Sequence, residues 1–305
     1  MKKLLAILMA VLMVLSFASC GKEETPAPKT SASETPSASE TPSASVPAEN
    51  QTIRLATTTS VNDSGLLGYL LPAFEKATGY KVEVASAGTG IAIGYAKSGD
   101  ADLLLVHSKK QEEQFIADGF ASTERLSFMY NYFVIVGPAD DPAGIADEEK
   151  AADAFEDIAE AKAPFASRGD NSGTHNKETG IWEAAEIDPS KESWYNSLGS
   201  GMGDTLTKAN ELKAYALTDK ATFLSMKDSL PNLAIIKAEA EDMKNTYSLL
   251  GVNPAAKDFE GKDVKINTEG AQALIDWLLG DEAAKLINEY GVSEYGEQLF
   301  FLLNK

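Results

Sequence analysis

The sequence predicts an α/β protein with largely parallel sheets and flanking helices. Segments that alternate apolar and polar residues, such as Lys81 to Ser86, and short apolar runs, such as Ala101 to Val106, are typical of strands. Strand-like segments alternate along the chain with segments of helical periodicity, and this alternation is typical of parallel sheets covered by helices. Ligands of such proteins bind at the carboxyl ends of strands, beside helix starts, so the loops at those positions are the candidate binding loops.

The first half of the folded body is predicted to start with a strand, Thr52 to Ala56, that runs into a polar loop, Thr57 to Ser60. Asp63 or Ser64 is placed to cap the next helix, whose apolar periodicity continues to Gly79. The remaining elements expected here are strands at 81–86, 101–106 and 132–136, and helices from after Gly90 to about Lys97 and from Lys109 to Asp118.

The second half continues the alternation. An acidic helix is expected from Ala146 to Ala161, and a strand from Pro164 to Ser167 leads to a helix that begins after Gly173. Thr218 and Asp219 have the side chains of an N-cap pair. The other elements expected are helices at 205–212, 221–230, 271–279 and 281–290, and strands at 215–217, 233–237 and 247–252.

The N-terminus is predicted to lie outside the folded body. Lys2 and Lys3 precede the apolar run Leu4 to Leu15, which is too short to span a membrane and indicates a signal peptide over residues 1–19. Cys20, the one cysteine of the chain, follows small residues and resembles the modified cysteine of a bacterial lipobox. We therefore expect lipidation at Cys20, with an ordinary signal peptide and a chance cysteine as the alternative.

Residues 20–50 have the composition of a disordered linker. They repeat Ser, Thr, Pro and Glu and contain no apolar side chain larger than Val46, so they cannot bury enough surface to become ordered. The segment is predicted to be a spacer between a lipid anchor and a body that begins near Gln51.

The charge balance excludes some classes of partner. The chain has 46 acidic and 27 basic residues, a formal net charge of −19, which argues against nucleic acid and polybasic membrane contacts. It does not exclude an anion ligand, because charge at long range is screened over about 8 Å at physiological salt, whereas a buried site of oriented donors acts locally.

Three loops rich in hydroxyl groups and glycine are predicted to lie at the carboxyl edge of the sheet: Thr57 to Ser60, Ser86 to Gly90, and Ser167 to Thr174. A deprotonated tetrahedral oxyanion accepts hydrogen bonds and donates none, so its site should supply amides, hydroxyls and a cation. The residues of this kind in the three loops are Thr58, Thr59, Ser60, Thr89, Arg168, Ser172, Gly173 and Thr174.

The third loop carries the strongest signal. Arg168, Ser172 and Thr174 stand at offsets 0, +4 and +6, just before a helix whose first amides have no partner within the helix. The alternative is a plain N-cap by Ser172 or Thr174, with Arg168 in a surface ion pair. Capping alone explains the run of hydroxyls from Thr57 to Ser60 poorly.

The chain also resembles TupA-type tungstate-binding proteins, over about Ile53 to Pro254. The motifs that carry the resemblance are Ile53-Arg-Leu-Ala-Thr-Thr-Thr-Ser60, Asp63-Ser-Gly-Leu-Leu67, Gly99-Asp-Ala-Asp-Leu-Leu-Leu-Val-His-Ser108, Met129-Tyr-Asn131, Phe133-Val-Ile-Val-Gly-Pro138, Ser167-Arg-Gly-Asp170, Ser172-Gly-Thr-His175 and Ala214-Tyr-Ala-Leu-Thr-Asp219.

The resemblance implies a two-lobed, type II periplasmic-binding-protein-like fold, with the oxyanion held between the lobes. The lobes would comprise residues 51–134 with 246–305, and residues 135–245. It also implies an extracytoplasmic component of an ABC importer that binds tungstate as its ligand and needs no cofactor. Its partners would be the ABC permease and, through Cys20, the cell membrane, and a monomer is expected.

Tungstate, molybdate and phosphate remain open as ligands at this point. Phosphate often keeps a proton at neutral pH. The spacing of Arg168, Ser172, Gly173 and Thr174 also resembles that of phosphate-binding proteins, and this resemblance places their carboxylate acceptor at His107 or Ser108, where this chain has none. A donor-only site disfavours a protonated ligand, so tungstate and molybdate fit better.

An enzyme is the distant alternative, as a secreted hydrolase of phosphoesters. Ser172 and His175 could be nucleophile and base, but no third, orienting carboxylate is specified. His107 and His175 are the two histidines of the chain, and neither has metal-ligand spacing around it.

An adhesin using the acidic segment 146–161 would leave the three loops unexplained, and an amino-acid-binding protein would need a carboxylate for the ammonium group.

Overall fold

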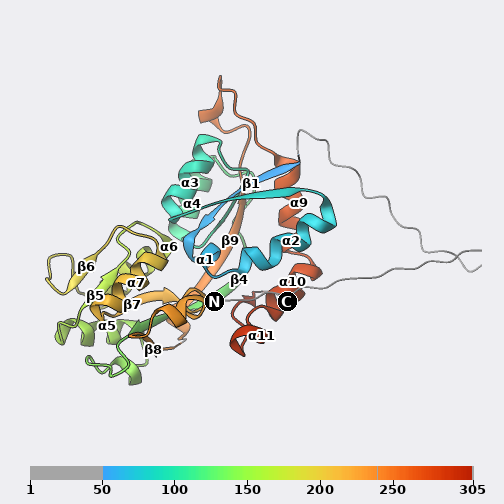
Figure 1. The fold of residues 1–305 in the computed structure, drawn as a ribbon. Coiled ribbons are helices and arrows are strands. Elements are labelled where there is room, and N and C mark those ends of the chain that lie inside the picture. The colour runs from blue at the N-terminus through green and yellow to red at the C-terminus, as the bar shows by residue number, and fades with distance from the viewer. Residues whose placement is uncertain (1–50, 239, 304–305) are drawn as a thin grey trace, which may run out of the picture. The chain divides into compact units, whose positions relative to one another are not determined.

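The computed structural model describes residues 51–238 and 240–303, all of which belong to one compact unit (Figure 1). The strands are β1 (Thr52–Thr58), β2 (Lys81–Ala87), β3 (Leu103–Val106), β4 (Leu126–Gly137), β5 (Phe165–Ser167), β6 (Tyr195–Ser197), β7 (Ala216–Asp219), β8 (Ala234–Lys237), β9 (Lys244–Gly251) and β10 (Phe301–Leu302). The α-helices are α1 (Thr59–Asp63), α2 (Leu66–Thr78), α3 (Thr89–Ser98), α4 (Lys109–Ala117), α5 (Ala151–Glu160), α6 (Gly173–Ala184), α7 (Met202–Leu212), α8 (Lys220–Met226), α9 (Thr268–Leu278), α10 (Asp281–Glu289) and α11 (Val292–Tyr295).

The sheet joins parallel strands to long antiparallel ones. Strand β1 pairs in parallel with β2 on one side and β3 on the other, and β5 pairs in parallel with β6. Strand β9 lies antiparallel between β3 and β4. Strand β4 is shared: Leu126–Tyr132 pairs with β9, whereas Phe133–Gly137 pairs with β7 and β8. The predicted α/β class is confirmed.

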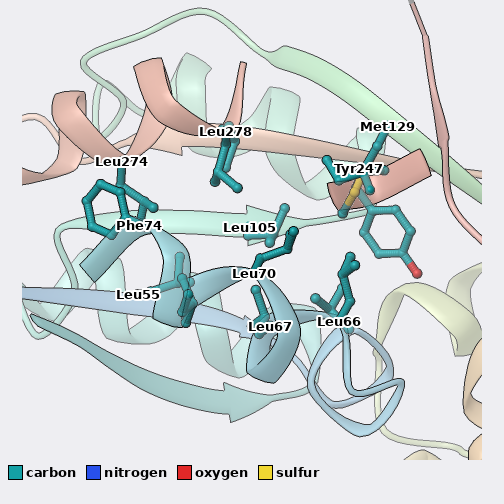
Figure 2. Close-up of a cluster of buried hydrophobic side chains, with 14 of the residues drawn as sticks. Leu55, Leu66, Leu67, Leu70, Phe74, Leu105, Met129, Tyr247, Leu274 and Leu278 are labelled. Atoms are coloured by element: carbon teal, nitrogen blue, oxygen red, sulfur yellow. The ribbon is translucent and has the colours of Figure 1, made fainter. Parts of the chain in front are cut away.

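Helices cover both faces of the part of the sheet built from β1, β3 and β9. Along β3, Leu103 and Leu105 point to one side and Leu104 and Val106 to the other, as the two-residue period of a strand requires. The first pair packs with residues of α2, α9 and α10, and the second pair with residues of α3 and α4. Figure 2 shows leucines of α2, among them Leu70, directed at this sheet. Burial on both faces explains why the sequence of β3 is a continuous apolar run.

The same rule builds the core around β7 and the second part of β4. Phe133 and Ile135 pack into one cluster with aromatic residues of α5 and α6 such as Trp182, and Val134 and Val136 pack into another with residues of α7 and α8. These two cores anchor α6 and α7 against opposite faces of the strands, and both helices begin at the candidate site described below.

Several predicted boundaries were wrong. The segment 57–60 is not a loop, because β1 continues to Thr58 and α1 begins at Thr59. Neither Asp63 nor Ser64 is the N-cap of α2, whose N-cap is Gly65 in the left-handed conformation (φ 82°). The segment predicted as one helix over 146–161 is a short 3₁₀ turn followed by α5.

Two further boundaries differ. Helix α7 starts at Met202, three residues before the predicted Thr205, and β4 starts at Leu126 instead of Tyr132. Asp219 is confirmed as an N-cap, since its carboxylate accepts a 2.9 Å hydrogen bond from the amide of Thr222.

The signal peptide, the lipidation of Cys20 and the linker are predicted for residues outside the described range and stay predictions. Within 51–238 and 240–303, every helix is too short or too polar to cross a bilayer.

Candidate functional site

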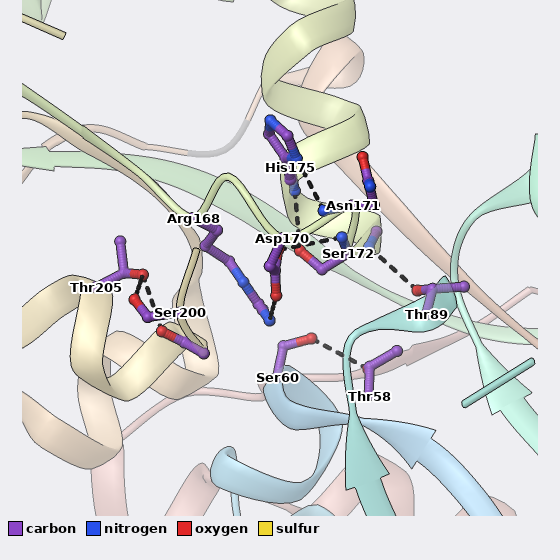
Figure 3. Close-up of polar contacts among 12 residues, drawn as sticks. Thr58, Ser60, Thr89, Arg168, Asp170, Asn171, Ser172, His175, Ser200 and Thr205 are labelled. Atoms are coloured by element: carbon purple, nitrogen blue, oxygen red, sulfur yellow. Dashed lines mark hydrogen bonds and ion pairs between the residues drawn. The ribbon is translucent and has the colours of Figure 1, made fainter. Parts of the chain in front are cut away.

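The structure brings the three predicted loops together. The amide of Gly173 donates a 3.1 Å hydrogen bond to the hydroxyl of Thr89, which joins the third loop to the second. The imidazole of His107 joins the first loop to the third: its Nε2 is 3.3 Å from Ser60 Oγ, and its ring lies against Gly173, where an added Cβ would be 2.4 Å from Cε1. Residues distant in sequence therefore surround one small region (Figure 3).

Local sequence explains the shape of the third loop. After β5 the chain turns at Gly169, which has φ +62° and sits so close to Ser197 that a Cβ would be 2.1 Å from its Oγ, so only glycine fits. Asn171 also has a positive φ, 55°, which asparagine tolerates. Ser172 then caps α6 by accepting a 3.2 Å hydrogen bond from the amide of His175.

Arg168 is the central side chain of the site. The side chain is only 1% exposed, yet only one of its nitrogens has a hydrogen-bond partner. That nitrogen, Nη2, donates a 2.6 Å charge-assisted bond to the carboxylate of Asp170 (Figure 3). Its Nε and Nη1 are buried and have no hydrogen-bond partner. Leaving donors of a charged group unpaired in a protein interior is costly, so these two nitrogens indicate a missing acceptor.

Two hydroxyls share this property. Thr59 Oγ1 and Thr174 Oγ1 are buried and without a hydrogen-bond partner. Thr59 lies at the start of α1 and Thr174 in the first turn of α6. We call Thr59, Arg168 and Thr174 the donor cluster, because each presents at least one buried donor that the protein does not satisfy.

The other five predicted residues have partners within the protein. The hydroxyls of Thr58 and Ser60 are 3.2 Å apart, and that of Ser172 serves as the helix cap. Thr89 and Gly173 bond to each other. All five are buried and border the donor cluster, and each has at least one partner within the protein, whereas Thr59, Arg168 and Thr174 carry buried polar atoms that have none.

His107 is held as a neutral ring with a defined tautomer. Asn245 Oδ1 is 2.8 Å from Nδ1, and the Asn245 amide nitrogen donates to Asn131 and Tyr247, so the amide oxygen accepts and Nδ1 carries the proton. Burial lowers the pKa of His107 to about 4. At neutral pH its Nε2 is therefore an acceptor for the hydroxyl of Ser60.

Carboxylates near the guanidinium do not occupy its free nitrogens. Burial acts to raise the pKa of Asp170, but the charge of Arg168 and the hydrogen bonds from Ser172 outweigh it, so that pKa lies below its usual value. Asp170 is thus ionised and occupied by Arg168 and by the amide of Ser172 at 3.1 Å. Burial raises the pKa of Asp219 to about 6, and this carboxylate caps α8.

The arrangement does not form a nucleophile–base pair. Ser172 Oγ accepts from the backbone amide of His175, and His175 Nδ1 accepts a 3.0 Å bond from the backbone amide of Asn171. Each side chain is used in local turn structure instead of contacting the other. Within 51–238 and 240–303, no group of three or more His, Cys, Asp or Glu side chains is placed to hold a metal ion.

One part of the site was missed from the sequence. The start of α7 lies beside the donor cluster: an added Cβ on Gly201, its N-cap, would be 3.8 Å from Thr59 Cγ2, and the amide of Ser200 donates a 3.0 Å bond to the carbonyl of Arg168. Figure 3 shows Ser200 and Thr205 next to Arg168. The signal was present in the run Gly199-Ser-Gly-Met-Gly203, a glycine-rich helix start like that of the other loops.

A buried carboxylate beneath the site gives a pH-dependent prediction. Glu178 of α6 is 2% exposed and accepts bonds from Tyr195 (2.7 Å) and Trp182 (3.2 Å). Burial raises its pKa from 4.5 to about 7, so the folded state favours the protonated form. Its contribution to stability is therefore fully present below pH 4.5 and decreases as the pH rises toward about 7.

Glu178→Gln removes this titration and keeps the acceptor oxygen. We expect the free energy of unfolding of the variant, relative to that of the parent, to rise by roughly 2 kcal/mol between pH 5 and pH 8, measured by urea unfolding. Glu183→Gln, at an exposed position of the same helix, is the control and should show no such trend. A constant difference for Glu178→Gln at both pH values would contradict the assignment.

A family model and a curated relative match most of this chain. A family model described as a PBP superfamily domain matches residues 40–282. The chain is 42% identical to the tungstate-binding protein TupA of Peptoclostridium acidaminophilum, over 98% of each chain.

Solved structures give the same result. One is the tungstate ABC transporter from Geobacter sulfurreducens, with 44% identity and a TM-score of 0.70 over 79% of this chain and 99% of that one. Another is the tungstate-binding protein TupA from Desulfovibrio alaskensis G20, with 37% identity and a TM-score of 0.68 over 83% and 99% of the two chains.

Proposed function

From the premise that this chain belongs to the TupA-type tungstate-binding proteins of the periplasmic-binding-protein superfamily, we propose that it binds tungstate at the donor cluster and delivers it to an ABC importer. The chain is a binding protein and not an enzyme, since its relatives are named for tungstate binding and transport.

The single observation that carries the proposal is the set of unsatisfied buried donors. Two nitrogens of Arg168 and the hydroxyls of Thr59 and Thr174 are buried and have no hydrogen-bond partner. A deprotonated tetrahedral oxyanion supplies four acceptor oxygens for these donors. Its negative charge also complements the guanidinium, which pairs with Asp170 through only one nitrogen. With about 1.5–3 kcal/mol for each charge-assisted bond, four such bonds support tight binding after the costs of association.

The choice among oxyanions follows from protonation. Tungstate and molybdate are fully deprotonated at neutral pH, whereas phosphate often keeps a proton and then needs an acceptor. The carboxylate nearest to the cluster, that of Asp170, is already occupied by Arg168 and Ser172. His107 follows β3, at the position where the resemblance to phosphate-binding proteins places their carboxylate acceptor. Its Nε2 is 3.3 Å from the hydroxyl of Ser60. These contacts favour tungstate, with molybdate as the nearer alternative and phosphate as the more distant one.

The cellular context remains part of the proposal. The protein would be extracytoplasmic, anchored to the cell membrane through a lipid on Cys20, and would act as a monomer that docks on an ABC permease. Its two lobes, residues 51–134 with 246–305 and residues 135–245, would close on the ion, with β4 as one of the crossings between them. No cofactor is needed, since the bound oxyanion is cargo.

Calorimetric titration of the purified chain with tungstate, molybdate, sulfate and phosphate tests the proposal. We expect one-to-one binding of tungstate and no heat with phosphate at neutral pH. Tight tungstate binding should also raise the melting temperature, by linkage. Binding of phosphate in preference to tungstate, or turnover of a phosphoester, would overturn the proposal.

A further inference from the structure

A cavity lined by basic side chains lies beside the donor cluster. It has a volume of about 350 Å³, and Lys109, Arg125, Lys177 and Lys244 contribute to its walls. The chain as a whole has a formal net charge of −19, so four basic side chains around one small cavity make the charge there differ from the average of the protein. Such a local concentration of charge attracts anions that the rest of the surface repels.

Two of the four cations are paired with carboxylates. Arg125 Nε binds the buried carboxylate of Glu112, and Arg125 Nη1 donates a 2.6 Å bond to the hydroxyl of Ser127. Lys109 has a looser partner, since its Nζ is 3.6 Å from Glu113 and its side chain is 71% exposed. The positive charges of Arg125 and Lys109 are therefore partly neutralised by Glu112 and Glu113.

The charges of Lys177 and Lys244 are less compensated. Lys177 Nζ donates to the backbone carbonyl of Asp242, and Lys244 Nζ lies 3.9 Å from the centre of the Tyr130 ring. Neither contact neutralises the ammonium group. Burial lowers the pKa of Lys177 although Asp242 acts to raise it, which indicates a poorly solvated cation. An anion in the cavity would stabilise this charged form.

The cavity and the donor cluster share two wall residues. His107 and Gly173 line the cavity, and the same two residues border the cluster through Ser60, Thr89 and the adjacent Thr174. Within the cluster, Arg168 and Thr174 are each 1% exposed, so under the proposed function an ion reaches them only while the two lobes are apart. The basic cavity is bordered by Gly173, the first residue of α6, which directly precedes Thr174.

We infer that the basic cavity is a second, weaker anion site, which takes the same class of ligand, a divalent tetrahedral oxyanion, and raises its concentration beside the donor cluster. The inference rests on the proposed function. The cavity binds more weakly than the donor cluster because its basic side chains are less buried than Arg168, and because Glu112 and Asp242 offset part of the charges of Arg125 and Lys177. Its main effect is on the rate of association, which local charge can raise by about 10-fold to 10³-fold at low ionic strength.

The test compares association rates in a double variant, Lys177→Gln with Lys244→Gln. The dissociation constant of radiolabelled tungstate is measured by equilibrium dialysis, and its dissociation rate by a chase with excess unlabelled tungstate; their ratio gives the association rate. We expect this rate to fall by about 10-fold at low ionic strength, and the difference from the parent to disappear in roughly 0.5 M salt.

The matched control removes the same charge elsewhere. Lys262 and Lys285 are exposed, and Lys285 is 73% exposed beside Glu289. The double variant Lys262→Gln with Lys285→Gln should change the association rate by less than about 2-fold. Equal rates and equal salt dependence for the two double variants would overturn the inference.

A single variant keeps the inference testable if the double variant misfolds. Lys109 is exposed, so Lys109→Gln should leave the fold intact and lower the association rate by about 2-fold to 3-fold. An unchanged rate in that variant, together with a misfolded double variant, would count against the inference. Failure of the parent chain to retain tungstate in dialysis would instead overturn the proposed function, and the two failures are thereby distinguished.

Discussion

Arg168→Ala should abolish measurable high-affinity binding of tungstate. The substitution removes the cation and both partnerless nitrogens, while the hydroxyls of Thr59 and Thr174 would then face a dianion without its countercharge. Loss of two or three charge-assisted bonds costs about 4–6 kcal/mol, or roughly 10³-fold to 10⁴-fold in the dissociation constant. Calorimetric titration measures the loss directly.

The fold of that variant is checked without ligand. Removing Arg168 deprives Asp170 of its ion pair but also removes two buried, unsatisfied donors, so these effects on ligand-free stability oppose each other. The melting temperature of the ligand-free variant should therefore change little, while its increase on adding tungstate disappears. A variant that binds tungstate as the parent does would refute the site assignment.

Two further substitutions separate charge from geometry at the same site. Arg168→Lys keeps the positive charge but loses the planar fork of donors, and should bind with intermediate affinity. Thr174→Val removes one partnerless hydroxyl at constant shape, and should weaken binding by about 10-fold with no loss of ligand-free stability. Affinity is expected to decrease in the order parent, Thr174→Val, Arg168→Lys, Arg168→Ala.

Gly173→Ala should damage both the fold and the site. The new Cβ would lie 2.4 Å from Cε1 of His107 and 2.7 Å from both ring nitrogens. The ring cannot move away freely, because Asn245 holds Nδ1 at 2.8 Å and Ser60 is 3.3 Å from Nε2. We expect a loss of about 1–3 kcal/mol in the free energy of unfolding from overpacking. Because α6 must shift to relieve the contact, tungstate affinity should also fall by about 100-fold.

Gly180→Ala is the matched control on the same helix. An added Cβ at Gly180 meets nothing within 4 Å, and the residue is exposed. The change should stabilise the protein by up to about 1 kcal/mol, because alanine favours helix more than glycine does, and should leave tungstate affinity unaltered. Urea unfolding measures the stability of the two variants, and calorimetry measures their tungstate affinity. Equal changes in stability and affinity for the two variants would contradict the role given to the contact between Gly173 and His107.

Much of the fold was predictable because it depends on local periodicity. The apolar run of β3 and the alternation of β2 were sufficient to assign those strands, and the side chain of Asp219 was sufficient to assign the cap of α8. The errors fell where local signals were ambiguous. Four consecutive hydroxyl residues, Thr57 to Ser60, predict a loop, but β-branched threonine also suits a strand, and the sheet extends β1 to Thr58.

The start of α7 shows the same limit. Gly201 and Gly203 are poor helix residues, so the helix was expected only from Thr205. Packing of Met202 and Leu206 into the core that also contains Ala166 fixes the earlier start and brings Ser200 next to Arg168. Tertiary contact overrode propensity and added a fourth segment to the site.

The sequence by itself determined the chemistry of this protein: a guanidinium, which only donates, and a set of hydroxyls, which can donate, lie in three glycine-rich segments with helix starts beside them. Which of those donors stay open was decided by the tertiary structure. Thr58, Ser60, Thr89, Ser172 and Gly173 have partners within the protein, whereas Thr59, Arg168 and Thr174 do not. The physical reason is that residue type sets what a group can donate, while only the packing of distant segments sets whether an acceptor lies within reach.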